Sequence, residues 1–170
     1  MAGEPSDWPS PPSGMHSPWQ ALSVLMGLSG ERLARAEHGG EVESFRDKLA
    51  DRLEEACKIV QEEAKRVIGT YEYGWPRLKP ETVVRKGGAD TPLLETGALR
   101  DSIEYTVDRD NLTAWVGSDD PIAPYQELGT VTIPARSFLA GAAMRKEAEI
   151  VRKTGVSVHG LILKDLGING

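Results

Sequence analysis

The chain contains a single cysteine, Cys57, among its 170 residues. One thiol excludes an intramolecular disulfide framework and a zinc site built on several thiolates. Basic residues are also scarce: 20 lysines and arginines stand against 26 aspartates and glutamates, for a formal net charge of −6 at pH 7. This balance argues against a protein that coats nucleic acid through a basic surface, although it leaves room for a local basic patch.

Long apolar runs are absent too, since none approaches the ~18 residues that span a bilayer. The N-terminal stretch carries Glu4 and Asp7 where a secretory leader would have a basic start before an apolar run. We therefore expect a soluble chain that is not exported. A hydrophobic fraction of 39% still suffices for a core, and the length fits one domain.

Proline is concentrated near the N-terminus, at Pro5, Pro9, Pro11, Pro12 and Pro18. Such a segment cannot bury enough apolar surface to offset the entropy of ordering it. We expect residues 1–18 to be a flexible arm, residues 19–155 a single α+β domain, and residues 156–170 a C-terminal extension. The apolar residues of that extension do not distinguish a helix from a strand.

The strongest helical signal lies in residues 42–67. Apolar residues recur there at intervals of three and four: Val42, Phe45, Leu49, Leu53, Ala56, Val60, Ala64 and Val67. This period predicts a helix of about seven turns with one narrow apolar stripe, which must pack on a sheet or on another subunit. Ser17-Pro18 predicts the start of a shorter helix that ends near Gly30. Its apolar side would carry Trp19, Leu22, Leu25 and Met26.

Residues 70–98 break the helical period with glycines and prolines, which predicts a long ordered loop or short strands. Alternating polar and apolar residues from Ser102 predict a β-hairpin with its turn at 108–111 and its second strand at 112–117. Residues 121–128 are expected to form a short helix or turn. Residues 129–133 are expected to be an extended edge segment stopped by Pro134.

The last predicted helix covers residues 137–153 and ends at Gly155. Its expected buried stripe is Ala140, Met144, Ala148 and Val151. The order of elements indicates an α+β fold, in which a long N-terminal helix and a C-terminal helix pack on a small antiparallel sheet with long loops.

No sequence motif indicates catalysis, a cofactor or a metal. His16, His38 and His159 have no second ligand at the spacing of a compact site, and Cys57 is expected to be buried on the long helix. Asp119-Asp120-Pro121 is interpreted as a helix start rather than a cation site. Arg85-Lys86-Gly87-Gly88 is interpreted as a solvated turn, because it lacks the Walker pattern of a phosphate loop. We expect no enzyme; the enzyme alternative is a metal-dependent hydrolase that uses the acidic loops.

Turn formers and apolar or arginine anchors are dense between Gly69 and Leu139. Four segments follow one another there: GWPRLKPETVVRKGG, PLLETGALRDSI, AWVGSDDPIAPYQELGT and IPARSFL. In this order and spacing they resemble the neck and tail-completion proteins of long-tailed bacteriophages, a group of virion morphogenesis and tail-component proteins. The resemblance covers about residues 41–155, so the proline-rich arm and the C-terminal extension lie outside it.

The resemblance implies a structural motif in three of these segments. Its positions are Thr96, Gly97, Leu99, Arg100, Ser102 and Ile103, then Val116, Gly117, Tyr125 and Gly129, then Ile133, Pro134, Ala135, Arg136, Phe138 and Leu139. Ser137 stands where the family usually has a second proline and makes a better N-cap.

The resemblance further implies a non-enzymatic virion subunit at the junction of head and tail. A hexameric ring of the chain would complete or terminate the tail and join it to the head connector through identical heterologous contacts. The expected partners are other copies, the tail-tube protein, a connector or stopper protein, and genomic DNA that passes through the lumen without sequence-specific binding. The expected location is the virion, with the host cytoplasm during assembly. The alternative is a head-side connector or stopper ring that contacts DNA. A separate alternative class is a nucleic-acid-contacting structural protein that uses Arg77, Arg85 and Lys86 as a patch.

The candidates for the subunit interface are Trp75, Arg77, Arg100, Tyr125, Arg136, Phe138 and Leu139. Arg100 and Arg136 are expected to donate across the interface, and the aromatic residues to anchor it. Tyr125 and Phe138 fit a place in the chain's own core equally well. Arg136→Glu is accordingly predicted to impair ring formation while the monomer stays folded.

Overall fold

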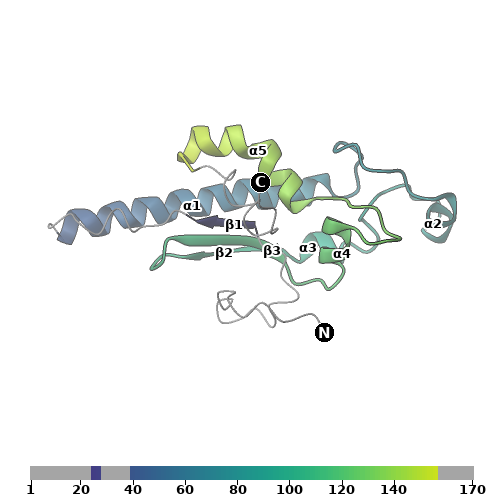
Figure 1. The fold of residues 1–170 in the computed structure, drawn as a ribbon, viewed down its shortest axis with the longest axis horizontal. Coiled ribbons are helices and arrows are strands. Elements are labelled where there is room, and N and C mark those ends of the chain that lie inside the picture. The colour runs from purple at the N-terminus through teal and green to yellow at the C-terminus, as the bar shows by residue number, and fades with distance from the viewer. Residues whose placement is uncertain (1–23, 28–38, 157–170) are drawn as a thin grey trace.

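The computed structural model of the protein describes residues 24–27 and 39–156. Its elements are β1 (Val24–Gly27), α1 (Gly39–Val67), α2 (Pro80–Arg85), α3 (Ala98–Asp101), β2 (Ile103–Asp108), β3 (Thr113–Ser118), α4 (Ala123–Leu128) and α5 (Leu139–Thr154). The fold is α+β, as predicted. Figure 1 shows three layers, in which α1 lies between the antiparallel sheet and α5. The loops, α2 and α4 gather at the end of the molecule toward which α1 runs.

The long helix α1 confirms the prediction from periodicity. Leu53, Val60 and Val67 of the predicted stripe are fully buried. The buried surface is wider than that stripe, because α5 covers a second side of the helix and buries Ile59 as well. Phe45 is exposed, since the first turns of α1 extend past the sheet (Figure 1).

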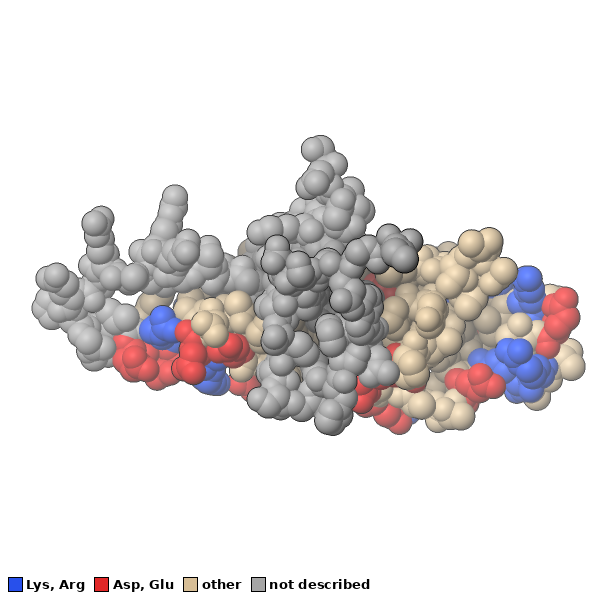
Figure 2. All heavy atoms as spheres, turned by 60° about the horizontal axis from the view of Figure 1, so that its bottom comes forward, with Lys and Arg blue, Asp and Glu red and all other residues tan. Residues whose placement is uncertain are grey.

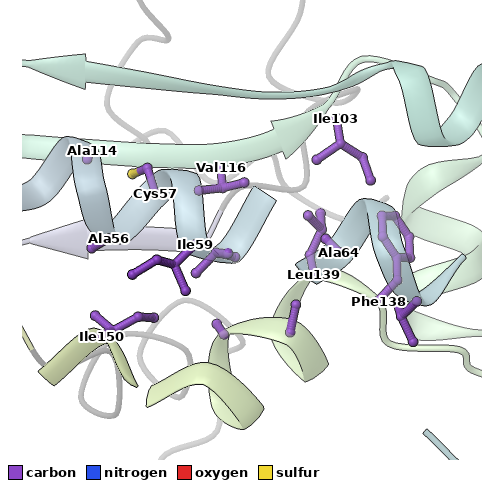
Figure 3. Close-up of a cluster of buried hydrophobic side chains, with 14 of the residues drawn as sticks. Ala56, Cys57, Ile59, Ala64, Ile103, Ala114, Val116, Phe138, Leu139 and Ile150 are labelled. Atoms are coloured by element: carbon purple, nitrogen blue, oxygen red, sulfur yellow. The ribbon is translucent and has the colours of Figure 1, made fainter. Parts of the chain in front are cut away.

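The core lies where α1 meets both of its neighbours (Figure 3). Val116 of β3 and Ile103 of β2 face α1 from the sheet, and Ile150 faces it from α5. Burial of each such side chain contributes roughly 1.5–3 kcal/mol. Cys57 is buried on α1 as predicted, and its burial, with a smaller contribution from Glu54, raises the pKa of its thiol to about 12. The thiol is therefore protonated and unreactive at neutral pH.

The predicted hairpin is present as β2 and β3, which pair antiparallel from Ile103↔Ser118 to Asp108↔Thr113. The Asp108 carboxylate accepts hydrogen bonds from the backbone N–H of Asp110 (3.0 Å) and Asn111 (2.9 Å) and so holds the turn. Ser102, expected to open the strand, instead ends α3. Its hydroxyl lies 2.6 Å from that of Ser118, which joins the two strand ends.

The helix predicted over residues 17–30 is wrong at Val24–Gly27. These residues form β1, which pairs antiparallel with β3 in the register Val24↔Val116 to Gly27↔Thr113. β3 pairs with β2 along one edge, and its other edge has backbone groups that need hydrogen-bond partners, which β1 supplies. The apolar pattern of residues 24–27 does not show that this distant edge exists, so it could not predict a strand. The rest of the predicted helix, the arm at 1–18 and residues 157–170 of the extension lie outside the described residues.

Two predictions for loop segments need correction. The 70–98 region contains a short helix, α2, which starts with Pro80 in the first turn, where its missing N–H costs no hydrogen bond. Residues 129–133 form a tight turn, closed by a hydrogen bond from Thr130 N to Ile133 O (2.8 Å), and no edge strand. The predicted short helix at 121–128 is confirmed as α4.

The last helix is confirmed as α5, but its predicted buried stripe is wrong. The buried residues are Leu139, Ala142, Ala143, Ile150 and Thr154. Met144 is 59% exposed and Val151 43% exposed. Both sets have helical spacing, and the neighbouring layer selects the set that presents the larger Leu139 and Ile150. An apolar row of Met144, Ala148 and Val151 is thereby left on the outside.

Glu63 of α1 is a buried carboxylate that ties α1 to the adjoining loop. It accepts hydrogen bonds from Nε (2.9 Å) and Nη2 (2.8 Å) of Arg66 and from the hydroxyl of Tyr73 (3.0 Å). Arg66, chiefly through these hydrogen bonds, lowers the pKa of the Glu63 carboxyl below its ordinary value of 4.5.

Since the pKa of Glu63 is lower in the folded chain than in the unfolded one, its contribution to stability is present above pH 4.5 and is lost as the pH falls through the folded value. We expect Glu63→Gln to be less stable than wild type at pH 7 and to lose less stability on acidification to pH ~3. Melting temperatures at both pH values test this, with the exposed Glu62→Gln as control. Parallel losses in wild type and Glu63→Gln would contradict it.

Candidate functional site

A groove of about 660 Å³ opens at the loop end of the molecule. All four sequence segments that carry the phage resemblance contribute to its lining. They supply most of the lining, from Pro76 to Lys86 around α2, from Leu93 to Leu99 before and within α3, at Ile122 and Gln126 near α4, and from Ile133 to Arg136, although not every residue of these stretches lines the groove. The volume is that of an ordinary binding pocket. The fold thus brings together at one place what the sequence shows as separate motifs.

The groove lining is rich in cations: Arg77, Lys79, Arg85, Lys86 and Arg136, against Glu95 and Asp120. Lys86 is engaged locally, because its Nζ donates to the carbonyl oxygens of Leu94 (2.6 Å) and Thr91. The turn that Lys86 belongs to is thus held by the lysine itself.

Arg77 is partly engaged as well. It pairs with Asp90 at 3.1 Å and lies 4.2 Å over the ring of Tyr71. Lys79 and Arg85 are exposed and form no ion pair with another described residue. These two cations are therefore available to a partner.

Arg136 is the unusual member of this group, because only 6% of it is exposed. Its Nη2 donates to the carbonyl oxygen of Pro76 (3.1 Å), which ties the 129–138 loop to the loop before α2. Its Nε is buried and has no hydrogen-bond partner within the described part of the chain. A buried donor without an acceptor costs about 1–3 kcal/mol, so this wall of the groove carries a donor that an incoming acceptor could satisfy.

Glu127 positions the loop that carries Arg136, and sequence reasoning missed it. Its carboxylate is 4% exposed and accepts hydrogen bonds from the backbone N–H of Phe138 (2.7 Å), Leu139 (2.9 Å) and Ala140 (2.9 Å). The hydroxyl of Ser137 donates to the same carboxylate (2.5 Å) and accepts from the N–H of Gly141 (3.2 Å). The N-cap position is Phe138 and not Ser137 as expected, and a carboxylate from α4 satisfies the first amides of α5.

Gly129 makes this arrangement possible. Its φ is +75°, and a Cβ there would lie 2.7 Å from the backbone nitrogen of Ala135 and 2.9 Å from the carbonyl oxygen of Ile133. Gly97 has a similar role at the start of α3, with φ +94° and the guanidinium of Arg100 close by. Both motif glycines thus serve the geometry of the groove wall.

The other motif residues divide between the core and the groove wall. Leu99, Ile103, Val116 and Gly117 are buried, whereas Pro134 and Ala135 are exposed and Ile133 is half-buried. The side chain of Thr96 accepts from the N–H of Ala98 (3.2 Å) and supports the start of α3.

An exposed apolar surface lies beside the groove. We call it the α4 face and define it as Ile122, Tyr125, Leu128 and Val131. Leu128 is more than half exposed and Val131 is fully exposed at the tip of the turn after α4. Contiguous exposed apolar residues of this kind mark interaction sites.

The predicted interface residues occupy different environments. Phe138 and Leu139 are fully buried, so Phe138 belongs to the chain's own core, one of the two places considered for it. Trp75 is also buried, with its ring 5.4 Å from that of Tyr73. Tyr125 is exposed, as are parts of Arg77 and Arg100, the latter paired with Asp101 at 3.0 Å.

Because Arg136 is buried, Arg136→Glu is not a test of ring formation that leaves the folding of the monomer unchanged. The substitution would replace a largely buried cation and remove its bond to the Pro76 carbonyl. A buried charge without a partner is strongly destabilising, so we now expect the monomer itself to be weakened.

In the described ranges, 24–27 and 39–156, no group of three or more His, Cys, Asp and Glu side chains could hold a metal ion. Asp120 behaves as a helix start: its carboxylate accepts from the N–H of Ile122 (3.0 Å) and its carbonyl from that of Ala123 (2.9 Å). His16, His38 and His159 lie outside those ranges. No helix among the described residues is long and apolar enough to cross a membrane.

Comparison with known proteins places this geometry in a phage family. The family model described as "Bacteriophage HK97-gp10, putative tail-component" matches residues 37–129, more than half of the chain. Two of the four motif segments fall within the match, the third lies within it except for Thr130, and IPARSFL lies just beyond it. No curated protein and no solved structure gives a significant match. The groove, its motif glycines and the α4 face are therefore features of a chain that belongs to the HK97-gp10-like family of bacteriophage tail components.

Proposed function

We propose that the chain forms a ring of identical copies, hexameric in stoichiometry, that completes or terminates the phage tail and joins it to the head connector. Membership of a tail-component family makes it a structural protein of the virion tail. The observation that supports assembly is the α4 face, an exposed apolar surface that the fold places beside a groove built from the family motifs. We further propose that assembly takes place in the host cytoplasm, before the tail and the head are joined.

The placement of apolar residues supports contacts that repeat around an axis. The α4 face and the outer row of α5, which includes Met144 and Val151, are two separate exposed surfaces on one chain. A contact between unlike surfaces of identical subunits is heterologous, and repetition of such a contact closes a ring when the rotation permits. Tail-tube and connector proteins would then meet the two rims of the ring.

Electron microscopy of particles that lack this protein tests the proposal. We expect tails of wrong length or tails that are not joined to heads. Heads that leak their DNA, found together with tails of normal length, would instead support the alternative, a stopper ring on the head side. That alternative is favoured by one observation, the cations of the groove, and it predicts salt-dependent retention of DNA by the isolated protein. Normal, infective particles would contradict both positions.

Replacement of two residues of the α4 face tests its part in assembly. Leu128→Ser combined with Val131→Ser is expected to weaken self-association about tenfold or more, because each side chain loses apolar area that a partner would bury. The fold should be unchanged, since both side chains face solvent. Sedimentation velocity measures the association. Glu62→Ser, at an exposed position of α1 away from the groove, is the control and should assemble as wild type.

A further inference from the structure

We propose that the groove of one copy receives the acidic end of α1 from the next copy, so that the subunits join head to tail. We define the acidic end as the residues Glu43, Asp47 and Asp51 of α1 with Asp108 and Asp110 of the hairpin turn. The inference rests on the proposed ring and assigns the two surfaces that close it.

The two surfaces lie at opposite ends of the molecule. In Figure 1 the first turns of α1 and the turn between β2 and β3 project at one end of the long axis, and α2 and α4, which line the groove, lie at the other. A contact between opposite ends of identical subunits is heterologous and continues from copy to copy. This geometry suits a ring and not an isolated two-fold dimer.

The charges of the two ends are complementary. Figure 2 shows mainly acidic side chains at the left end and a cluster of lysine and arginine at the right end. Glu43, Asp47 and Asp51 recur every four residues, so they form one acidic row along α1. Two exposed cations, Lys48 and Arg52, lie beside this row. Lys48 is three residues before Asp51, so the part of the row without a free cation at helical spacing is Glu43 and Asp47. The row therefore presents negative charge to a partner.

Two arginines of this end are engaged within it. Arg109 ties the hairpin turn to α1 through Asp51 (2.9 Å) and Glu54 (3.0 Å). The guanidinium of Arg46 donates to the backbone carbonyl oxygen of Asp110. These contacts hold the hairpin turn against the first turns of α1, so that the acidic end is one surface built from two elements.

The carboxylates of Glu43 and Asp47 are free for a partner. Both side chains are exposed, and neither forms an ion pair with another described residue. Phe45 is exposed between them in the sequence, at 47% of its surface. Two helical steps of about 100° place Phe45 on the opposite side of α1 from Glu43 and Asp47, so the carboxylates alone form the proposed contact.

The groove contains cations that can pair with those carboxylates. Lys79 and Arg85 are exposed cations without ion pairs in the described chain, and the buried Nε of Arg136 lacks an acceptor. A carboxylate beside Arg136 would satisfy that donor with a charge-assisted hydrogen bond. The groove rim also exposes Ile122 of the α4 face.

Charge reversal on each surface separately tests this arrangement. One variant carries Lys79→Glu and Arg85→Glu, and the other carries Glu43→Lys and Asp47→Lys. All four side chains are exposed and form no ion pair with a described residue, so both variants should fold. Sedimentation velocity of each full-length variant alone is expected to show self-association weakened at least tenfold. An equimolar mixture should regain wild-type association, because alternating copies place unlike charges together at every contact.

Controls separate this contact from a general effect of charge. Glu62→Lys on α1 and Glu104→Lys on β2 change exposed charges away from both surfaces and should assemble as wild type. Assembly of both reversed variants at the wild-type level, or failure of the mixture to recover, overturns the head-to-tail contact and leaves the proposed ring standing. A wild-type chain that stays monomeric at millimolar concentration, together with normal particles in its absence, contradicts the ring itself.

A second readout addresses nucleic acid in the groove. Wild type and the Lys79→Glu, Arg85→Glu variant are titrated with a short DNA duplex in parallel with the association measurements. Loss of DNA binding in the variant with unchanged self-association would assign the groove to nucleic acid and overturn the proposal. Weak DNA binding that is the same in both proteins agrees with it.

Discussion

Glu127→Ala is expected to lower the free energy of unfolding by about 3 kcal/mol or more. The substitution leaves three backbone N–H groups at the start of α5 without their acceptor and frees the hydroxyl of Ser137. Two of those amides are in buried surroundings, where an unmet donor costs most. Urea denaturation should show a lower midpoint with an unchanged slope.

Two further variants show whether the carboxylate itself is responsible. Glu127→Gln keeps one acceptor oxygen and is expected to lose about half as much stability, because the charge that favours a helix N-terminus is gone. Glu104→Ala, an exposed glutamate on β2, should change stability by less than about 0.5 kcal/mol. If Glu127→Ala is as mild as Glu104→Ala, the Glu127 carboxylate does not hold α5.

Gly129→Ala is the second substitution with a large expected effect, a loss of about 3 kcal/mol of stability. The new Cβ would lie 2.7 Å from one backbone atom and 2.9 Å from another, and neither can rotate away as a side chain can. The α4–α5 connection would have to shift, which moves Arg136 and the groove wall. Thermal and urea denaturation measure the loss.

Gly155 provides a control for a positive φ without a steric clash. Its φ is +73°, close to the +75° of Gly129, but a Cβ there meets no atom within 4 Å. Gly155→Ala should therefore show only the cost of the left-handed conformation, about 1 kcal/mol. The difference between the two variants combines the steric contribution with the cost of the backbone conformation of Gly129, whose ψ of 176° is open essentially to glycine alone, whereas Gly155 has a ψ of 7°. Equal losses would mean that the close approach of residues 133–135 to Gly129 is not maintained in solution.

These two residues connect stability to the proposed function. Glu127 and Gly129 hold the loop that bears Arg136, and Arg136 in turn reaches the Pro76 carbonyl across the groove. The groove wall thus depends on all three residues: the buried carboxylate and the glycine position the loop, and the buried arginine ties this loop to the Pro76 carbonyl. Variants that weaken this wall should impair assembly as well as folding, whereas the exposed charge reversals should impair assembly alone.

Several elements could be predicted because their causes are local. The helical period of Leu53, Val60 and Val67 runs unbroken through α1, and the alternation around Ile103 and Val116 specifies a half-buried hairpin. Cys57 was predicted to be a small buried side chain because it lies on the long helix and has no second cysteine to pair with. The order of the motif segments indicated a phage tail component, which the family match confirms.

The candidate site could be predicted only in part. The glycines and arginines of the motifs were recognised, but Arg136 and Leu139, expected at an interface, are buried, as is Phe138, for which interface and core were equally open. Glu127 was overlooked because a glutamate in a short polar segment has the same appearance whether it is solvated or caps a helix about ten residues away in the sequence. No spacing rule connects it to the amides of Phe138 and Leu139.

The sequence by itself determined the elements whose side chains repeat at a regular interval, the α+β class and the family. Only the tertiary structure decided that Val24–Gly27 is a strand, because its hydrogen bonds are made to β3. It also decided which side of α5 is buried, since two stripes one residue apart are equivalent until α1 packs against one of them. The physical reason is the same in each case: periodicity specifies a face, whereas a partner distant in the chain decides what that face meets.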